Sequence, residues 1–237
     1  MIVAASAIII PNAMAAPSSI AGMVVFIDPG HNGSNDGSIN RQVPTGRGGT
    51  KDCQTSGTAT NSGYMEHTFT WDTALRVRAE LNALGVRTAL SRANDNGLGP
   101  CVDERANAAN ALRPNAVLSI HADGGPPSGR GFHVNYSAPP LNQVQAGPSV
   151  QYARIMRDQL QASGIPPANY IGQNGLYGRS DLTGLNLAQY PSILVECGNM
   201  KNPADSALME SAEGRQKYAD ALVRGVAGFL ASQGQAR

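Results

Sequence analysis

The sequence predicts a single α/β domain with a largely parallel, twisted sheet flanked by helices. Short, fully apolar runs rich in β-branched residues alternate along the chain with segments whose apolar residues recur every three or four positions. The first pattern is typical of strands buried on both faces, and its alternation with helices is typical of parallel βαβ units. A chain of 237 residues is long enough for one domain of this class.

The first strand is expected at residues 23–27, where five apolar residues precede the turn sequence Asp-Pro-Gly. Residues 32–62 are rich in Gly, Asn, Ser and Thr, and they predict a long irregular loop that can include a small hairpin. The first helix is expected at residues 64–84, because the apolar residues keep helical spacing there until Gly85 ends the pattern.

The middle of the chain repeats this order of strands and helices. Residues 86–91 alternate as a strand, residues 102–112 have helical spacing, and residues 116–120 form a second fully apolar strand. A further strand is expected at residues 131–136 and a helix at residues 150–163.

The last apolar run predicts a third buried strand at residues 192–196, followed by a closing amphipathic helix at residues 214–233. Residues 141–148 and 166–187 are expected to be surface loops. Since no internal repeat, linker or charge block interrupts the chain, residues 16–237 are expected to form one domain.

The charge balance disfavours nucleic acid as a partner. The chain has 18 Lys and Arg residues against 17 Asp and Glu residues, a formal net charge of +1, and no basic run. Proteins that follow a phosphate backbone need a concentrated positive surface. No stretch reaches the roughly 20 apolar residues of a membrane span, so no stable membrane anchor is expected either. A monomer is the default expectation.

The N-terminus predicts export. An apolar run from Ile2 to Ile10 is followed by Ala13-Met14-Ala15, a small-x-small site at which a signal peptidase could cut before Ala16. Residues 1–15 are therefore expected to be a signal peptide, and the protein is expected to be secreted, in the periplasm or in the cell wall. Because the first ten residues contain no Lys or Arg, a late start codon or an ordinary buried strand remains an alternative.

The cysteines agree with an oxidising compartment. Cys53 and Cys101 both lie in Gly-, Asn- and Asp-rich loop sequence, where a cross-link is sterically easy, and we expect a disulfide between them. Cys197 follows a buried strand and is expected to stay reduced and buried. The alternative is three unrelated thiols of a cytoplasmic enzyme.

Three residues with useful chemistry stand at the ends of predicted strands: His31, His121 and Glu196. In open α/β sheets, ligands bind outside the carboxyl ends of the strands. With Glu66 from the first helix, the two imidazoles make a set of the kind that holds one catalytic Zn²⁺ ion, and Glu196 is left to act as the base. No compact ligand motif is present, so each residue could instead be an ordinary hydrogen-bonded side chain.

Four stretches of sequence strengthen the metal hypothesis. They are the first strand with its extension to Gly33, Glu66 near the start of the following helix, Leu-Ser-Ile-His-Ala-Asp around His121, and Ile-Leu-Val-Glu-Cys-Gly-Asn from Ile193 to Asn199. In this order they resemble the motifs of the zinc-dependent N-acetylmuramoyl-L-alanine amidases. The resemblance spans about residues 24–230, which is nearly the whole of the expected mature chain.

The resemblance implies a phosphorylase/hydrolase-like α/β fold and a function. His31, Glu66 and His121 match the zinc ligands of that family, and Glu196 matches its catalytic carboxylate. Such enzymes hydrolyse the amide bond between N-acetylmuramic acid and the L-alanine of peptidoglycan or muropeptides, in cell-wall remodelling, cell separation or fragment recycling. Asn199 departs from the family, in which an aromatic residue often stands three positions after the catalytic glutamate.

The sequence does not decide the roles of several other polar residues. His67 is expected to contact the long loop or solvent, because it points about 100° away from Glu66 on the helix. His133 is equally well structural or directed toward the substrate, and Asp28 and Asp123 could each accept a ring N–H from a ligand histidine, as backbone carbonyls also do. Four arginines could pair with a peptide carboxylate, and the sequence does not choose among them: Arg92, Arg105, Arg130 and Arg179.

Two other functions remain as alternatives at this stage. One is a zinc peptidase that acts on free peptides, and the other is a peptidoglycan-binding module without activity. The sequence has no G-x-S-x-G motif for a serine nucleophile.

Overall fold

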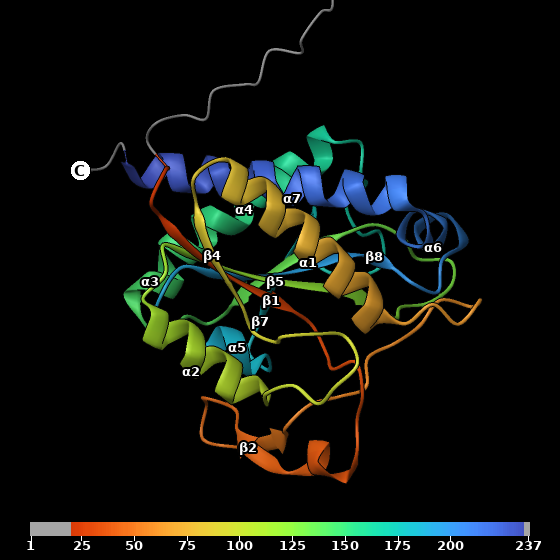
Figure 1. The fold of residues 1–237 in the computed structure, drawn as a ribbon, viewed down its shortest axis with the longest axis horizontal. Helices are drawn as coiled ribbons and strands as arrows, with labels where there is room; N and C mark the ends of the chain where they lie inside the picture. The colour runs from red at the N-terminus through yellow and green to blue at the C-terminus, as the bar shows by residue number, and fades with distance from the viewer. Residues whose placement is uncertain (1–19, 235–237) are drawn as a thin grey trace, which may run out of the picture.

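The computed structural model describes residues 20–234 of the chain. Its centre is a six-stranded sheet with helices on both faces (Figure 1). The strands, in spatial order, are β4 (Arg87–Leu90), β1 (Val24–Pro29), β5 (Ala116–Asp123), β8 (Ser192–Asn199), β6 (His133–Ser137) and β7 (Leu176–Arg179). Strand β6 pairs antiparallel with β8, and the other neighbours pair in parallel. The predicted fold class is confirmed.

Two layers of helices enclose the sheet. On one face lie α1 (Glu66–Ala83), α4 (Pro148–Ala162) and α7 (Ala212–Gly234). On the other lie the shorter α2 (Val102–Leu112) and α5 (Thr183–Asn186). The five strands and four helices predicted from periodicity are all present, with ends that differ by a few residues. The boundaries of α2 agree with the prediction because its helical spacing is uninterrupted.

The hydrophobic core lies under the longer helices. Alternate residues of β1, Val25 and Ile27, are fully buried in this core, which also contains Phe69 from α1, Met156 from α4 and Phe229 from α7. Burying a side chain of this size contributes roughly 1.5–3 kcal/mol. The opposite face of the same strands carries the polar residues of the site, because side chains alternate along a strand.

The segments predicted as loops contain small elements. Residues 166–187 include the edge strand β7 and the single turn α5, and residues 141–148 include the single turn α3 (Gln143–Ala146). These loop predictions are wrong, because four-residue elements have no readable periodicity and depend on the neighbours that pair with them. The helix α6 (Pro203–Glu210) was not predicted; the Asn202 side chain caps it by accepting from the N–H groups of Ala204 and Asp205.

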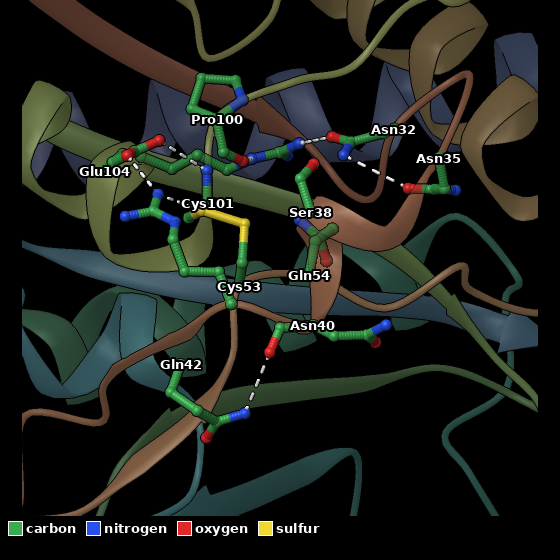
Figure 2. Close-up of a disulfide and its surroundings, with 12 residues drawn as sticks. Asn32, Asn35, Ser38, Asn40, Gln42, Cys53, Gln54, Pro100, Cys101 and Glu104 are labelled. Carbon is green, nitrogen blue, oxygen red and sulfur yellow. Dashed lines mark hydrogen bonds and ion pairs between the residues drawn. A yellow bond between two sulfur atoms is a disulfide. The ribbon is translucent and has the colours of Figure 1, made fainter.

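The long loop after β1 folds over the α2 side of the sheet. It contains the 3₁₀ turn η1 (Gly37–Asn40) and an antiparallel hairpin of β2 (Gln42–Pro44) and β3 (Thr50–Asp52), so the expected small hairpin is present. A disulfide joins Cys53, just after the hairpin, to Cys101 at the N-terminal end of α2 (Figure 2). Cys197 is free and buried. Both cysteine predictions are confirmed.

Two predictions concern the ends of the chain and its relation to membranes. The proposed signal peptide, residues 1–15, lies outside the described residues. Among residues 20–234, no helix combines the length and the apolar character that a membrane crossing needs.

Candidate functional site

Three potential metal ligands converge at the carboxyl edge of the sheet. His31 follows β1, Glu66 begins α1, and His121 lies in β5. The Glu66 carboxylate lies between the two rings, with Oε2 3.0 Å from His31 Nε2 and Oε1 3.0 Å from His121 Nδ1. Neighbouring ligand atoms around a tetrahedral zinc ion lie about 3.3 Å apart, since metal–ligand bonds are about 2.0–2.1 Å long. The set therefore fits a single metal ion.

Two glycines leave the space that the ligands occupy. A Cβ atom at Gly30 would collide with the ring of His121. A Cβ atom at Gly57 would lie 2.9 Å from both Glu66 Oε2 and His31 Cδ2. Side chains at these positions would push the ligands apart, so the close approach of the backbone is part of the site.

The His31 ring is fixed from two directions. Its Nδ1 lies 2.9 Å from the carbonyl oxygen of Thr55, which leaves Nε2 free for the metal position. Its backbone has a φ of 62°, in the left-handed region, and its carbonyl oxygen accepts a hydrogen bond of 2.7 Å from the buried guanidinium of Arg105. Arg105 also holds Asp28 Oδ1 at 2.9 Å, which ties the end of β1 to α2.

The electrostatics keep Glu66 ionised. Burial opposes ionisation, but the charge of His31 and the hydrogen bonds from both histidines lower the pKa of Glu66 far below its usual value. Its oxygens also accept from the N–H groups of Thr58 and Ala122, each at 3.0 Å. The same Glu66 charge outweighs burial at His31 and raises the pKa of that ring.

Glu196 lies on β8 directly beside His121 in the register of the two strands. Its Oε2 is buried and has no hydrogen-bond partner within the described residues. Burial, together with the charges of Glu66 and Asp123, raises the pKa of Glu196 well above its usual value, against the opposing effect of Arg179. A carboxyl group whose pKa is raised in this way holds a proton more readily than an exposed carboxyl group does.

The four residues open into a pocket of about 380 Å³. The segment 51–58 of the long loop forms one wall, and Ala106 and Ala109 of α2 and Leu185 of α5 form part of another. The site is thus enclosed by the long loop and by the two short helices.

A protein-family model described as N-acetylmuramoyl-L-alanine amidase matches residues 25–228. The chain belongs to this amidase family. It is 84% identical to the N-acetylmuramoyl-L-alanine amidase Rv3717 of Mycobacterium tuberculosis, over 100% of this chain and 98% of the relative.

Two solved structures share this fold closely. One is the N-acetylmuramyl-L-alanine amidase Ami1 from Mycobacterium smegmatis, with 78% identity and a TM-score of 0.91 over 91% of this chain and 100% of that one. The other is the apo form of Ami1 from Mycobacterium abscessus, with 65% identity and a TM-score of 0.88 over 89% of this chain and 100% of that one.

In this member of the amidase family, the remaining histidines have different surroundings. His67 pairs with Asp95, at 2.9 Å, so the expectation that it contacts the long loop or solvent was wrong. The reason is that residues after β4 fold back over the start of α1, which no local pattern indicates. His133 is 1% exposed, and its Nδ1 is buried without a hydrogen-bond partner within residues 20–234.

The two aspartates beside the ligand histidines serve neighbouring elements. Asp28 binds Arg105, and Asp123 accepts a hydrogen bond of 2.8 Å from the Tyr170 hydroxyl. The sequence left open whether a carboxylate or a backbone carbonyl accepts the ring N–H of His31. In the structure the acceptor is the carbonyl of Thr55. No local sequence signal marks it, because any residue supplies a carbonyl.

The four arginines separate into two groups. Arg92 and Arg105 are buried and bound to the chain around the end of β1, so they support the fold. Arg130 pairs with the buried Asp205, and Arg179 pairs with Asp181 near Glu196. Of the four, Arg179 is the one whose charge acts on Glu196, so it remains a candidate partner for a peptide carboxylate.

Asn199, the departure from the family pattern, is fully buried. Its amide nitrogen donates to the carbonyl oxygens of Pro126 and Gly129, each at 2.8 Å. It therefore fixes the loop that follows β5, and an aromatic side chain has no NH₂ group with which to hold both carbonyls.

Proposed function

We propose that the chain is a zinc-dependent hydrolase that cleaves the amide bond between N-acetylmuramic acid and L-alanine in peptidoglycan or muropeptides. The observation that carries the proposal is the position of Glu196: a buried carboxyl with a free oxygen, beside three converging metal ligands. Membership of the amidase family supports this reaction. The enzyme would serve in wall remodelling, cell separation or fragment recycling.

His31, Glu66 and His121 would hold one Zn²⁺ ion. Two imidazoles and a carboxylate are a donor set of catalytic zinc sites, which keep a fourth position open. When bound, zinc makes water a nucleophile near neutral pH and polarises the carbonyl group of the substrate. The clustered donor atoms and the space left by Gly30 and Gly57 support this assignment.

Glu196 would move the proton. Its carboxylate takes a proton from the attacking water as the oxygen of that water bonds to the amide carbon. It then gives the proton to the nitrogen of L-alanine as the C–N bond breaks. The products are a muramic acid carboxyl group and a peptide with a free N-terminal alanine. The raised pKa of Glu196 suits a group that must hold this proton between the two steps.

The protein would act outside the cytoplasm as a monomer. Residues 1–15 would be removed as a signal peptide, and the Cys53–Cys101 disulfide supports export, because such bonds persist in oxidising compartments. Mass spectrometry of the protein purified from culture medium or cell envelope would locate the mature N-terminus. An intact residue 1 there would contradict cleavage.

The test is digestion of muramyl dipeptide and of a longer muropeptide, analysed by mass spectrometry, with and without a zinc chelator. We expect release of peptide with N-terminal alanine, loss of activity on chelation and recovery with zinc. Glu196→Gln should keep its zinc and lose activity by about 10²–10⁴-fold. An active Glu196→Gln variant would overturn the mechanism. Cleavage of free peptides alone would indicate a peptidase, and zinc-loaded protein that binds both substrates without cleavage would indicate a binding module.

A further inference from the structure

The antiparallel strand β6 brings an additional side chain to the carboxyl edge of the sheet. Since β6 runs against β8, its first residue lies beside the end of β8, and His133 is directly opposite Glu196 in the register. Residues directly opposite each other in an antiparallel pair point to the same face, with Cβ atoms about 4.5–5.5 Å apart. The ring of His133 and the carboxyl group of Glu196 are therefore neighbours.

Both side chains have a buried polar atom without a partner. His133 Nδ1 and Glu196 Oε2 are the two atoms, and neither forms a hydrogen bond within the described residues. Leaving such a group unpaired costs roughly 1–3 kcal/mol, and native proteins leave few of them. Two on opposite residues, next to the proposed metal site, indicate a functional pair.

The neighbouring side chains pack against the His133 ring but form no hydrogen bond with its Nδ1. The rings of Tyr170 and Tyr177 meet it edge-on, with centroid distances of 6.4 Å and 6.0 Å. The Tyr170 hydroxyl is engaged with Asp123, so it does not serve as a partner for the imidazole. Burial lowers the pKa of His133 to about 4. A neutral ring carries one N–H donor and one acceptor nitrogen.

We propose that His133 is a positioning residue of the hydrolysis, whose Nδ1–H donates a hydrogen bond to Glu196 Oε2 and holds the carboxylate in the orientation that receives the proton of water. The bond requires a rotation about the terminal torsion of Glu196, and that torsion is soft. The inference rests on the proposed function, because it gives His133 a role at Glu196, the carboxylate that moves the proton in that mechanism. The metal ligands lie on one side of Glu196 and His133 on the other.

Asn135 provides a matched control. It lies on the same strand and the same face, is fully buried, and has an unpartnered Oδ1, but it is opposite Leu194 instead of Glu196. Asn135→Leu and His133→Phe each remove a buried polar group from β6. Only the second removes a donor beside the catalytic carboxyl.

The experiment measures kcat and KM on muramyl dipeptide, zinc per chain and thermal midpoint for His133→Phe, His133→Asn and Asn135→Leu. We expect His133→Phe to lower kcat about 10–100-fold, the usual effect of removing such a partner, with KM and zinc content unchanged. His133→Asn should recover most of the rate, because the asparagine amide nitrogen is as many bonds from Cβ as Nδ1. Asn135→Leu should stay within about twofold of the unaltered enzyme.

Three results would overturn the inference: a rate of His133→Phe within twofold of the unaltered enzyme, equal losses in His133→Phe and His133→Asn, or a loss that follows zinc content. If His133→Phe does not fold, His133→Leu replaces it as the variant without a donor. An unaltered chain that cuts no muropeptide would overturn the proposed function and this inference together. If the unaltered chain is active and the variant without a donor at position 133 is equally active, this inference alone is overturned.

Discussion

The guanidinium of Arg105 connects the fold to the site, and its removal should be costly. The side chain is 4% exposed and donates five hydrogen bonds from α2. Arg105→Met keeps an unbranched apolar stem and deletes every donor. It leaves the Asp28 carboxylate without its counter-charge and the carbonyl oxygen of His31 without its donor. Breaking a buried ion pair on one side costs about 3–5 kcal/mol, so we expect the free energy of unfolding to fall by that amount.

Urea unfolding of the metal-free chain measures this loss directly, and an exposed arginine provides the control. Arg154→Met on α4 should change the free energy of unfolding by less than about 0.5 kcal/mol. Because Arg105 also holds the left-handed backbone at His31, we expect Arg105→Met to weaken zinc binding by about 10–100-fold in a competition titration. A loss below about 1 kcal/mol with unchanged zinc affinity would refute the reasoning, since a buried pair would then contribute no more than a surface one.

Two further predictions concern stability. Replacing both Cys53 and Cys101 with serine opens a loop with a sequence separation of 48. We expect the free energy of unfolding to fall by about 2–4 kcal/mol with zinc retained, and an unchanged urea midpoint would contradict this. Acid should also destabilise the fold. Burial opposes ionisation, but the charge of Arg105 and hydrogen bonds from Ser91 and Ser119 lower the pKa of Asp28 from 3.8 to about 2. The ionised carboxylate therefore contributes about 2 kcal/mol above pH 3.8, and this is lost as the pH falls through 2. Urea midpoints at pH 5 and pH 2 should differ less in Asp28→Asn than in the unaltered chain, and equal differences would contradict the assignment.

The fold could be predicted where the signal is local. The apolar run of β1 predicts a strand and the spacing of apolar residues in α2 predicts a helix, because a buried strand and an amphipathic helix differ in periodicity. The edge strand β7 could not be predicted, because its four residues become a strand only by pairing with β6. The direction of β6 beside β8 is likewise set by packing, and nothing within residues 131–136 encodes it.

The site divides in the same way. His31, His121 and Glu196 were predicted together because parallel strands end at one edge of a sheet, and the structure places them there. The Thr55 carbonyl and the Thr58 N–H come from the irregular loop, and backbone groups carry no residue signature. The Thr55 carbonyl determines which ring nitrogen of His31 is free, and the Thr58 N–H holds Oε2 of Glu66. The sequence therefore supplies the proposed ligands, and the loop supplies their orientation.

The mixed sheet explains why His133 was left open between a structural and a substrate-directed role. In a purely parallel sheet, the first residue of a strand lies at the edge opposite the site, where a histidine would have only a structural role. Reversing β6 moves its start to the catalytic edge, opposite Glu196. The proposed metal ligands then lie on one side of the Glu196 carboxylate, and the neutral ring of His133 lies on the other. A neutral ring can hold the carboxylate without competing for its proton. An antiparallel strand in a largely parallel sheet thus gives this edge a residue that strand ends alone could not supply.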